Sequence, residues 1–548
     1  MPGGPTAGTL GGAMPIDPRT PVIVGAGRHT NRPGGEPAGR AEPVDLMIRA
    51  VVAAADDCGG GNGGGTGGGG STVGRRLLER ARSLWVVDPL SWAYLNPGLL
   101  VAQALGLSPD ELGVSAAGGN DGLRLVHRTA LAVGRGELDV AVLVAADCGH
   151  SLAAARRHPE RPVLPWTVQP TDTPRPLRLG NDQRPTTDAE EAKGLDTAIH
   201  VYPLFENALR AEAGRSLAEH RAMLGSLWAG HSRIAAGNPH AWLPVERTSE
   251  EITEPSPANR MVSYPYTKLL SANDQVDQAA ALILCSAATA RAAGVPTDRW
   301  VFPLAGSDTT EHWYLSHRAD FRSAPALRLA GRAALSLAGC TVDDVAHVDL
   351  HACFPAAAEL GASELGVDLW DAARPATVTG GLTFAGCPGN GYGVHAVATM
   401  VDKLRHDAGS LGLVSGVGWY LSEHGVGLYG TAPGHASSPA GPGHPADGPH
   451  MRIESAAGFA WADPQQAVSA LPQCSPDADA RGEVTVETYS VACDRGGSPT
   501  RAVVACRTLG DRRTWATVTD EDQLRLLVDE EGCGRLGTLS GDGTVDLS

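Results

Sequence analysis

A unit of strand, glycine-rich turn, helix and strand occurs twice in this sequence, and it limits the possible folds more than any other feature. The first copy, between residues 112 and 148, reads LGVSAAGG, GGNDG, LRLVHRTALAVGRG and LDVAVLVAADC. The second copy, between residues 373 and 421, leads from ARPATVTGG through a glycine loop into GVHAVATMVDKLRHD and SLGLVSGVGWYL. β-Branched runs that alternate with helical patterns predict an α/β layered fold. The repeat predicts two similar halves related by a pseudo-twofold axis.

Both glycine turns lead directly into a helix. Such a turn presents free backbone N–H groups and the positive end of the helix dipole, which favour a carboxylate, a phosphate or a developing oxyanion. Two turns, one from each half, could converge on a single site. The alternative is that the glycines only allow close packing of helix and strand.

Low-complexity segments divide the remaining chain. The predicted order is a disordered tail at 1–19, an N-terminal half at 20–290, a C-terminal half at 291–430, a linker at 431–449 and an accessory β domain at 450–548. The tail, the linker and a glycine run at 59–71 have too little apolar surface to offset their chain entropy. Alternating stretches in the last domain predict a small, OB-like β-barrel. We expect a chain cut near residue 430 to stay folded but to lose solubility.

Composition excludes several classes of function. With 44 Lys and Arg against 61 Asp and Glu, the net charge is −17, and no basic stripe supports binding of nucleic acid. The apolar runs are far shorter than the roughly 20 residues of a membrane helix. The ten cysteines show no metal-like or C-x-x-C spacing, which favours reduced thiols and a cytoplasmic location. A dinucleotide site is disfavoured because Thr30 stands where the third glycine of G-x-G-x-x-G belongs.

Several motifs together resemble the thiolase superfamily, in its acetyl-CoA acetyltransferase and sterol-carrier-type thiolase branch. VIVGAGR resembles the opening strand of thiolases, HACF at 351–354 resembles their H-D-C-F motif, and GGLTFAGCPGNGYG resembles their G-H-P glycine loop. LVSGVGWY resembles their C-x-G-x-G loop, and the similarity spans about residues 20 to 430. The resemblance implies the thiolase fold, with a loop domain at 150–265 that covers coenzyme A.

The resemblance also implies a set of ligand-binding residues. A coenzyme A thioester is the implied ligand or substrate, and no tightly bound cofactor or metal is expected. The residues that would contact it are Gly386, Gly389, Gly416, Gly418 and His231. Thiolases typically dimerise, so a homodimer is the default expectation, with a monomer possible if an added segment covers the pairing edge.

The catalytic residues of the family are only partly matched. Gly119 occupies the place of the nucleophilic cysteine, and Val414 occupies that of the second, acid/base cysteine. Cys387 stands where the family has its general-base histidine. His351, in the HACF motif, is retained where the family holds the thioester oxygen. The resemblance therefore implies an acyltransferase-class protein with little or no thiolase activity.

A relocated nucleophile is an alternative. Cys387 or Cys353 would serve if His351 or His395 lay close enough to activate the thiol. The contrary interpretation is that Cys387 fills a tight turn and His395 packs in a helix. Three functions stay open: an acyltransferase of altered mechanism, a non-catalytic protein that binds acyl thioesters, and a scaffold.

Overall fold

The structure is a computed structural model that describes residues 16–32, 41–59, 71–434 and 451–548. The predicted tail, glycine run and linker lie largely outside the described residues. Within the part that is described, no helix has the length and apolar character that crossing a bilayer requires.

The first sheet has six strands in the order β1-β8-β4-β2-β3-β5. Their bounds are β1 (Pro21–Thr30), β2 (Ser83–Val87), β3 (Glu111–Ser115), β4 (Val140–Cys148), β5 (Leu177–Leu179) and β8 (Asp277–Ser286). The helices of this half are α1 (Pro43–Asp57), α2 (Thr72–Leu78), α3 (Pro97–Leu105), α4 (Asp121–Arg135), α5 (Gly149–Arg157) and α10 (Ala287–Ala293). Every residue of β4 is buried, which its continuous apolar sequence predicts for a central strand.

The second sheet also has six strands, in the order β10-β11-β12-β9-β14-β13. Their bounds are β9 (Phe302–Thr310), β10 (Val345–Asp349), β11 (Leu411–Gly418), β12 (Glu423–Gly430), β13 (Arg452–Ala456) and β14 (Phe459–Asp463). The helices of this half are α11 (Pro325–Ala338), α12 (Pro355–Leu365), α13 (Gly381–Phe384), α14 (Tyr392–His406) and α15 (Gln465–Ser469).

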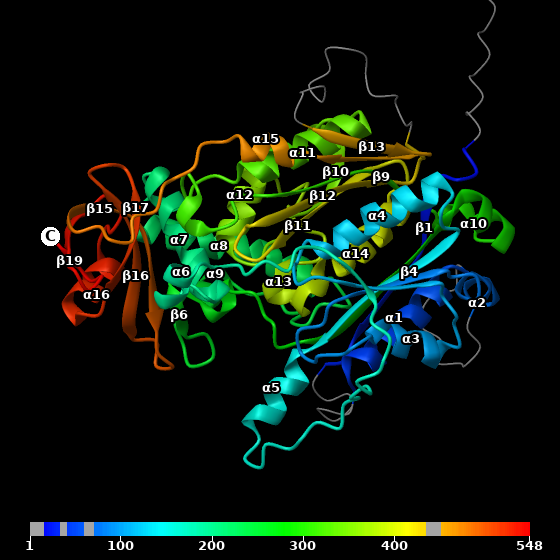
Figure 1. Ribbon diagram of the computed structural model, residues 1–548, viewed down its shortest axis with the longest axis horizontal. Coiled ribbons are helices and arrows are strands. Elements are labelled where there is room, and N and C mark those ends of the chain that lie inside the picture. Colours follow the sequence, from blue (N-terminus) through cyan, green and yellow to red (C-terminus); the bar gives the residue numbers. More distant parts are fainter. Residues whose placement is uncertain (1–15, 33–40, 60–70, 435–450) are drawn as a thin grey trace, which may run out of the picture.

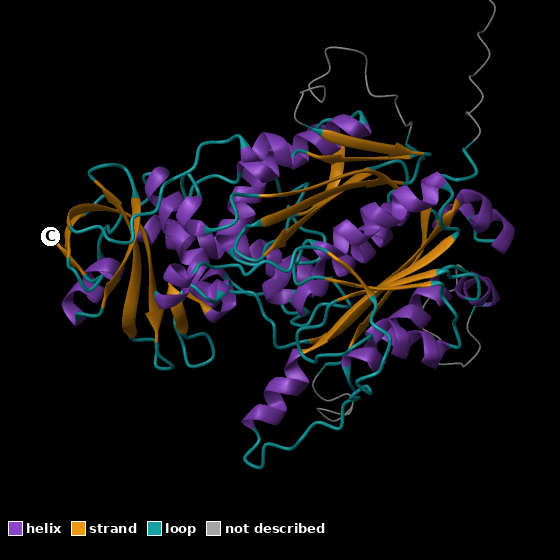
Figure 2. Cartoon of the chain, in the orientation of Figure 1, coloured by secondary structure: helices purple, strands orange, loops and turns teal. Residues whose placement is uncertain are grey.

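Helices α4 and α14 lie between the two sheets, while α1 covers the outer face of the first sheet and α11 covers that of the second (Figures 1 and 2). Four strands of each half share the same order and the same directions. In the first half β1 and β4 flank β8 antiparallel, and β2 pairs parallel with β4. In the second half β9 and β11 flank β12 antiparallel, and β10 pairs parallel with β11. The two similar halves are confirmed.

The segment between β4 and β8 is mainly helical. It contains α6 (Asp188–Ala192), α7 (Ala198–Glu212), α8 (Leu217–Ala236) and α9 (Ser249–Thr253), followed by the short strands β6 (Met261–Tyr264) and β7 (Tyr266–Thr267). Ser216 caps α8 with a capping box, which fixes where that helix begins. All of these elements except β7 lie within residues 150–265, the range predicted for a loop domain.

The C-terminal strands form a third sheet in the order β17-β16-β15-β18-β19. Their bounds are β15 (Gly482–Cys493), β16 (Pro499–Thr508), β17 (Arg513–Val518), β18 (Leu536–Leu539) and β19 (Val545–Leu547), with α16 (Glu521–Asp529) beside them. Strand β6 adds to the edge of β15, so this sheet continues into the helical segment. A closed barrel is not confirmed, because one isolated bridge, Thr517 to Thr544, is the connection between β17 and the β19 end.

The predicted start of the accessory domain at residue 450 differs from the structure. Strand β14 pairs with β9, and β13 pairs with β14, so both strands extend the second sheet of the body. The separate C-terminal sheet begins at β15. The local sequence of β13 and β14 shows a hairpin pattern but does not specify which sheet the hairpin joins.

Candidate functional site

The two glycine turns meet where α4 and α14 begin. A Cβ atom on Gly122, in the first turn of α4, would lie 2.8 Å from the backbone nitrogen of Val394. A Cβ atom on Gly393 would lie 3.3 Å from Gly122 Cα. Close packing of the two helices therefore requires glycine at these positions. The starts of α4 and α14 thus pack against each other, while convergence of the two turns on a ligand site stays a prediction.

Gly119 lies beside His351, but there is no space for a side chain at Gly119. A Cβ atom there would lie 3.1 Å from His351 Cε1 and 2.3 Å from the carbonyl oxygen of Val417. Cβ atoms in proteins essentially never come so close to a backbone oxygen. The position matched to the family nucleophile thus faces the matched histidine, while the backbone of β11 fills the volume that a thiol would need.

His351 is buried and held in a fixed orientation. The residue is 6% exposed, its N–H donates to Ser415 Oγ at 3.0 Å, and its ring contacts Tyr392 edge to face at 5.1 Å. Burial lowers the pKa of His351 to about 3, so the imidazole is neutral at physiological pH. Its Nδ1 atom has no hydrogen-bond partner among the described residues. The other ring nitrogen, Nε2, faces Gly119 at 3.5 Å from a Cβ placed there, and a neutral imidazole that carries its proton on Nε2 can donate to a carbonyl oxygen.

The two cysteines of the candidate site are not activated. Burial raises the pKa of the Cys353 thiol to about 12, and burial also raises the pKa of the Cys387 thiol far above its ordinary value. Cys387 Sγ faces the carbonyl oxygen of Gly389 at 4.0 Å, and among the described residues it has no hydrogen bond to a histidine. His395 instead lines a small cavity with Arg28 and other polar residues. The pairing that a relocated nucleophile needs is therefore not present within the described part of the chain.

Val414 and the two glycines after it pack against the first turn. Val414 is fully buried in β11, opposite Gly427. Cβ atoms on Gly416 and Gly418 would lie 3.0 Å from Asn120 Cα and 2.5 Å from Asn120 Oδ1. These glycines permit a close approach of β11 to the first turn, which is the packing role that the sequence left open for them.

The glycines of the second turn face side chains rather than open space. Gly386 and Gly389 have φ angles of +113° and +53°, and Cβ atoms there would lie 2.2 Å from Gln278 Oε1 and 2.1 Å from Asp147 Oδ2. A carboxylate next to Gly389 opposes binding of a phosphate at that point. His231, on α8, packs against another part of the loop, where its Cδ2 atom would lie 2.9 Å from a Cβ placed on Gly381. Burial lowers the pKa of His231 to about 4.

A buried charged network beside the first turn was not predicted. Arg124 donates to Asp121 Oδ1 at 2.8 Å and to Glu423 Oε1 at 3.1 Å, and both carboxyl groups lie close to Gly118. Burial raises the pKa of both Asp121 and Glu423. The spacing of Asp121 and Arg124, three residues apart at the start of a helix, is a sequence signal for their pair. No local signal identifies Glu423, which is 299 residues from Arg124.

The segment after β11 adopts an unusual backbone conformation. Trp419 and Leu421 have positive φ angles of +53° and +58°, which are unfavourable for large side chains. Tyr202 donates its hydroxyl to the carbonyl oxygen of Trp419 at 3.1 Å, and Arg318 donates to the next carbonyl at 2.8 Å. These contacts restrain the segment that begins just after Val417, whose carbonyl closes the space at Gly119.

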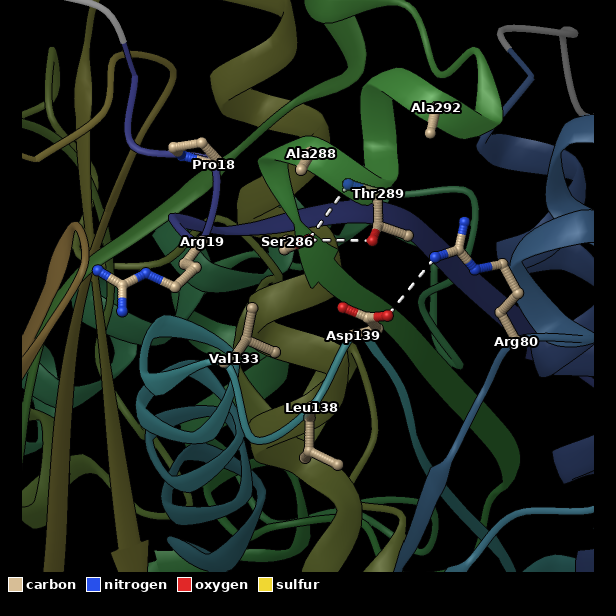
Figure 3. Close-up of a pocket in the computed structure, with 11 residues that line it drawn as sticks. Pro18, Arg19, Arg80, Val133, Leu138, Asp139, Ser286, Ala288, Thr289 and Ala292 are labelled. Atoms are coloured by element: carbon tan, nitrogen blue, oxygen red, sulfur yellow. Dashed lines mark hydrogen bonds and ion pairs between the residues drawn. The ribbon is translucent and has the colours of Figure 1, made fainter.

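Two cavities among the described residues are lined by neither Gly119 nor His351. The larger one is a surface pocket between the start of β1, the end of α4 and α10 (Figure 3). Its wall carries Arg19 and an ion pair between Arg80 and Asp139. It lies at the opposite end of α4 from Gly119, and 15 helical residues span about 22 Å.

Comparisons with known proteins bear on the fold and on the C-terminal domain. A family model described as the thiolase-like protein type 1 additional C-terminal domain matches residues 463–544. A crystal structure of a monomeric SCP2-thiolase-like protein type 1 from Mycobacterium smegmatis is 28% identical, covers 97% of this chain and 99% of that chain, and has a TM-score of 0.77. The chain belongs to the thiolase superfamily. As in type 1 thiolase-like proteins, an additional C-terminal domain follows the thiolase-like body.

Two other proteins match parts of this thiolase-like chain. An acetyl-CoA acetyltransferase of Methanothermobacter thermautotrophicus is 32% identical over 189 residues, which are 32% of this chain and 47% of that protein. The chain thus spans about half the length of the curated relative it matches. The dimeric peroxisomal thiolase of Saccharomyces cerevisiae is 14% identical, with a TM-score of 0.53 over 76% of this chain and 98% of that chain, and supports the fold alone.

Proposed function

We propose that this thiolase-superfamily protein binds an acyl-CoA or a related thioester and has no thiolase activity. The observation that supports this most directly is the first turn, where His351 remains next to Gly119 while the Val417 carbonyl occupies the nucleophile's space. A covalent acyl-enzyme needs a nucleophile at that place. His351 retains the capacity to donate a hydrogen bond to a thioester oxygen.

The residues of the second turn take a positioning role in this proposal. Gly386, Gly389, Gly416 and Gly418 shape the walls of the candidate site, and His231 supports the loop at Gly381. Cys353 and Cys387 stay protonated, because burial raises both thiol pKa values. The proposed ligand is therefore held by hydrogen bonds and packing, without a covalent intermediate.

Titration calorimetry with acetoacetyl-CoA and an assay of its thiolysis test this proposal together. We expect binding without measurable thiolysis. His351→Ala is expected to weaken binding about tenfold, the effect of one lost hydrogen bond of about 1.4 kcal/mol. His347→Ala, a change at a nearby histidine that pairs with Asp407, is the matched control and is expected to leave binding unchanged. Thiolysis that Cys387→Ala abolishes would contradict the proposal.

A scaffold without a small-molecule ligand is the second candidate. The observation that favours it is that His351 and Gly119 line neither of the two cavities. The absence of heat with acetyl-CoA, acetoacetyl-CoA and free CoA would support this second function over the first.

We also propose that the protein is monomeric and cytoplasmic. Strand β5 pairs parallel with β3, with Gly113 opposite Leu177, and so covers the outer edge of the first sheet. Covering an edge strand with a short segment of the same chain disfavours pairing with a second molecule. The cysteines support the cytoplasmic location, because their spacing is typical of reduced thiols.

A further inference from the structure

A cluster of buried titratable groups lies behind the HACF segment and is not used by the proposed function. It consists of Glu206 on α7, His220 on α8 and Glu359 on α12. One carboxylate oxygen or imidazole nitrogen from each residue lies within 4.8 Å of the others. Glu206 is 0% exposed, His220 is 1% exposed, and the Glu359 side chain is 11% exposed. The cluster therefore joins the helical segment between β4 and β8 to the second half of the body.

The hydrogen bonds of the cluster determine where its protons lie. Arg215 donates to Glu359 Oε2 at 3.0 Å and to His220 Nδ1 at 3.3 Å. A guanidinium can only donate, so Nδ1 accepts and the His220 proton is on Nε2. Nε2 then donates to Glu206 Oε1 at 2.7 Å, and Tyr266 donates its hydroxyl to Glu206 Oε2 at 2.6 Å.

One carboxylate oxygen of the cluster has no hydrogen-bond donor in this arrangement. Glu359 Oε1 is buried and has no hydrogen-bond partner among the described residues if both carboxyls are ionised. Two adjacent buried carboxylates repel each other, and one proton between them removes both the repulsion and the missing hydrogen bond. The backbone amide of Ala356, in the first turn of α12, also bonds Glu206 and favours its ionised form. The proton therefore resides on Glu359.

The electrostatic surroundings agree with this assignment. Burial and the neighbouring charge of Glu206 raise the pKa of Glu359 to about 8, against the opposing effects of His220 and Arg215. Burial raises the pKa of Glu206 as well, while bonds from Glu359, Tyr266 and Ala356 act against that rise. Arg210, the remaining charge near His220, is paired with Glu531. A divalent metal is not required, because the Arg215 guanidinium already supplies the cation.

Aromatic packing links this cluster to the candidate site. The ring of Phe354, the last residue of the HACF segment, stacks on Tyr202 at 4.5 Å and lies 5.3 Å from the ring of Tyr266. Helix α12 begins at the next residue, and Glu359 is on its first turns. We propose that a proton shared by Glu206 and Glu359 fixes the 351–354 segment in place, and that loss of this proton loosens that segment.

The pH dependence of stability provides the first test. Folding raises the pKa of the Glu359 carboxyl from 4.5 to about 8. Between these pH values the carboxyl is ionised in the unfolded chain but protonated in the folded chain, so the free energy of unfolding falls as the pH rises. In Glu359→Gln the amide N–H donates to Glu206 in place of the acid. We expect thermal unfolding to show a smaller fall in Tm from about pH 5 to about pH 8 in this variant than in wild type. Glu137→Gln, at an exposed glutamate, is the matched control and is expected to follow wild type.

Infrared difference spectra give a second measurement on the unmodified protein. We expect the carbonyl band of a protonated carboxyl at neutral pH, and we expect it to disappear as the pH rises above about 8. The band is expected to be weaker in Glu359→Gln. If that variant does not fold, Glu206→Gln replaces it in the same comparison. An unchanged carboxyl band in a folded variant, or an unchanged Tm profile, would overturn the shared proton.

Two further measurements distinguish the shared proton from a bound metal and test its link to the candidate site. Added Zn²⁺ is expected to leave Tm unchanged, and a rise in wild type that is lost in Glu359→Gln would mean that the cluster binds metal instead. Binding of acetoacetyl-CoA, a measurement that rests on the proposed function, is expected to weaken with rising pH in wild type but less in Glu359→Gln. If acetoacetyl-CoA does not bind at all, the proposed function is contradicted, but the Tm and infrared tests of the cluster still apply. If it binds with the same pH dependence in both proteins, the link to the 351–354 segment is wrong.

Discussion

The two halves of the body share four strands in the same order, yet their glycine turns differ in what surrounds them. In the first half, the backbone oxygen of Val417 occupies the position of a Cβ atom on Gly119. In the second half, side chains crowd the turn, with Gln278 at Gly386, Asp147 at Gly389 and His231 near Gly381. The difference teaches that backbone closes the space at Gly119, whereas side chains crowd the glycines of the second turn.

The halves also differ at their edges. In the first half, β3 and then β5 continue the sheet beyond β2. In the second half, the Leu350 N–H donates to the carbonyl oxygen of Ala376, but the described residues around Ala376 form no strand. The second sheet is extended on its other edge instead, where β14 joins β9. Residues beyond the predicted linker thus complete the second half but not the first.

The largest expected effect is on a chain cut after residue 430. This cut removes β13 and β14, exposes the edge of β9 and removes Phe459, which is 1% exposed. Burial of one such side chain contributes about 1.5–3 kcal/mol. We therefore expect no cooperative thermal unfolding in circular dichroism, which revises the expectation that this chain stays folded.

A chain cut after residue 470 is the matched control. It keeps β13, β14 and α15, together with the hydrogen bond from Trp461 Nε1 to Asp308 at 2.7 Å. We expect it to unfold cooperatively at a lower temperature than the full chain. Equal behaviour of the two shortened chains would show that the hairpin is not part of the second half.

The next effect concerns Gly119. We expect Gly119→Ala to lower the free energy of unfolding by about 1–3 kcal/mol, because the new methyl group forces the Val417 carbonyl away. Gly230→Ala, where a Cβ meets nothing within 4 Å on α8, is the control and is expected to stabilise by about 0.5–1 kcal/mol. Urea unfolding measures both changes.

The same crowding predicts the outcome of rebuilding the family's catalytic groups. Gly119→Cys is expected to give no thiolysis of acetoacetyl-CoA, alone or with Cys387→His and Val414→Cys. A stable Gly119→Ala protein, or activity in the triple variant, would show that the first turn is as open as a thiolase active site.

The sequence predicts the fold better than it predicts the site. Helix periodicity places α1 at residues 43–57, where the structure has it, and the repeated unit predicts the two halves. The contact between Gly119 and Val417 joins residues 298 positions apart, and no local pattern reports it. The partner of Glu423 is equally remote. His351 and Gly119 both lie in segments with family signatures and are neighbours in the structure, while their role toward a ligand stays a prediction.

The smallest expected effect is on the rate at which Cys387 is alkylated, compared with Cys340, a partly exposed cysteine outside the second turn. Iodoacetamide reacts with the thiolate, so its rate follows the fraction of thiol that is ionised. Burial raises the pKa of Cys340 to about 11, and it raises that of Cys387 further. We expect Cys387 to be alkylated at least about tenfold more slowly than Cys340, as measured by peptide mass spectrometry over time. A faster reaction at Cys387 would mean that the second turn, unlike the first, still activates a nucleophile.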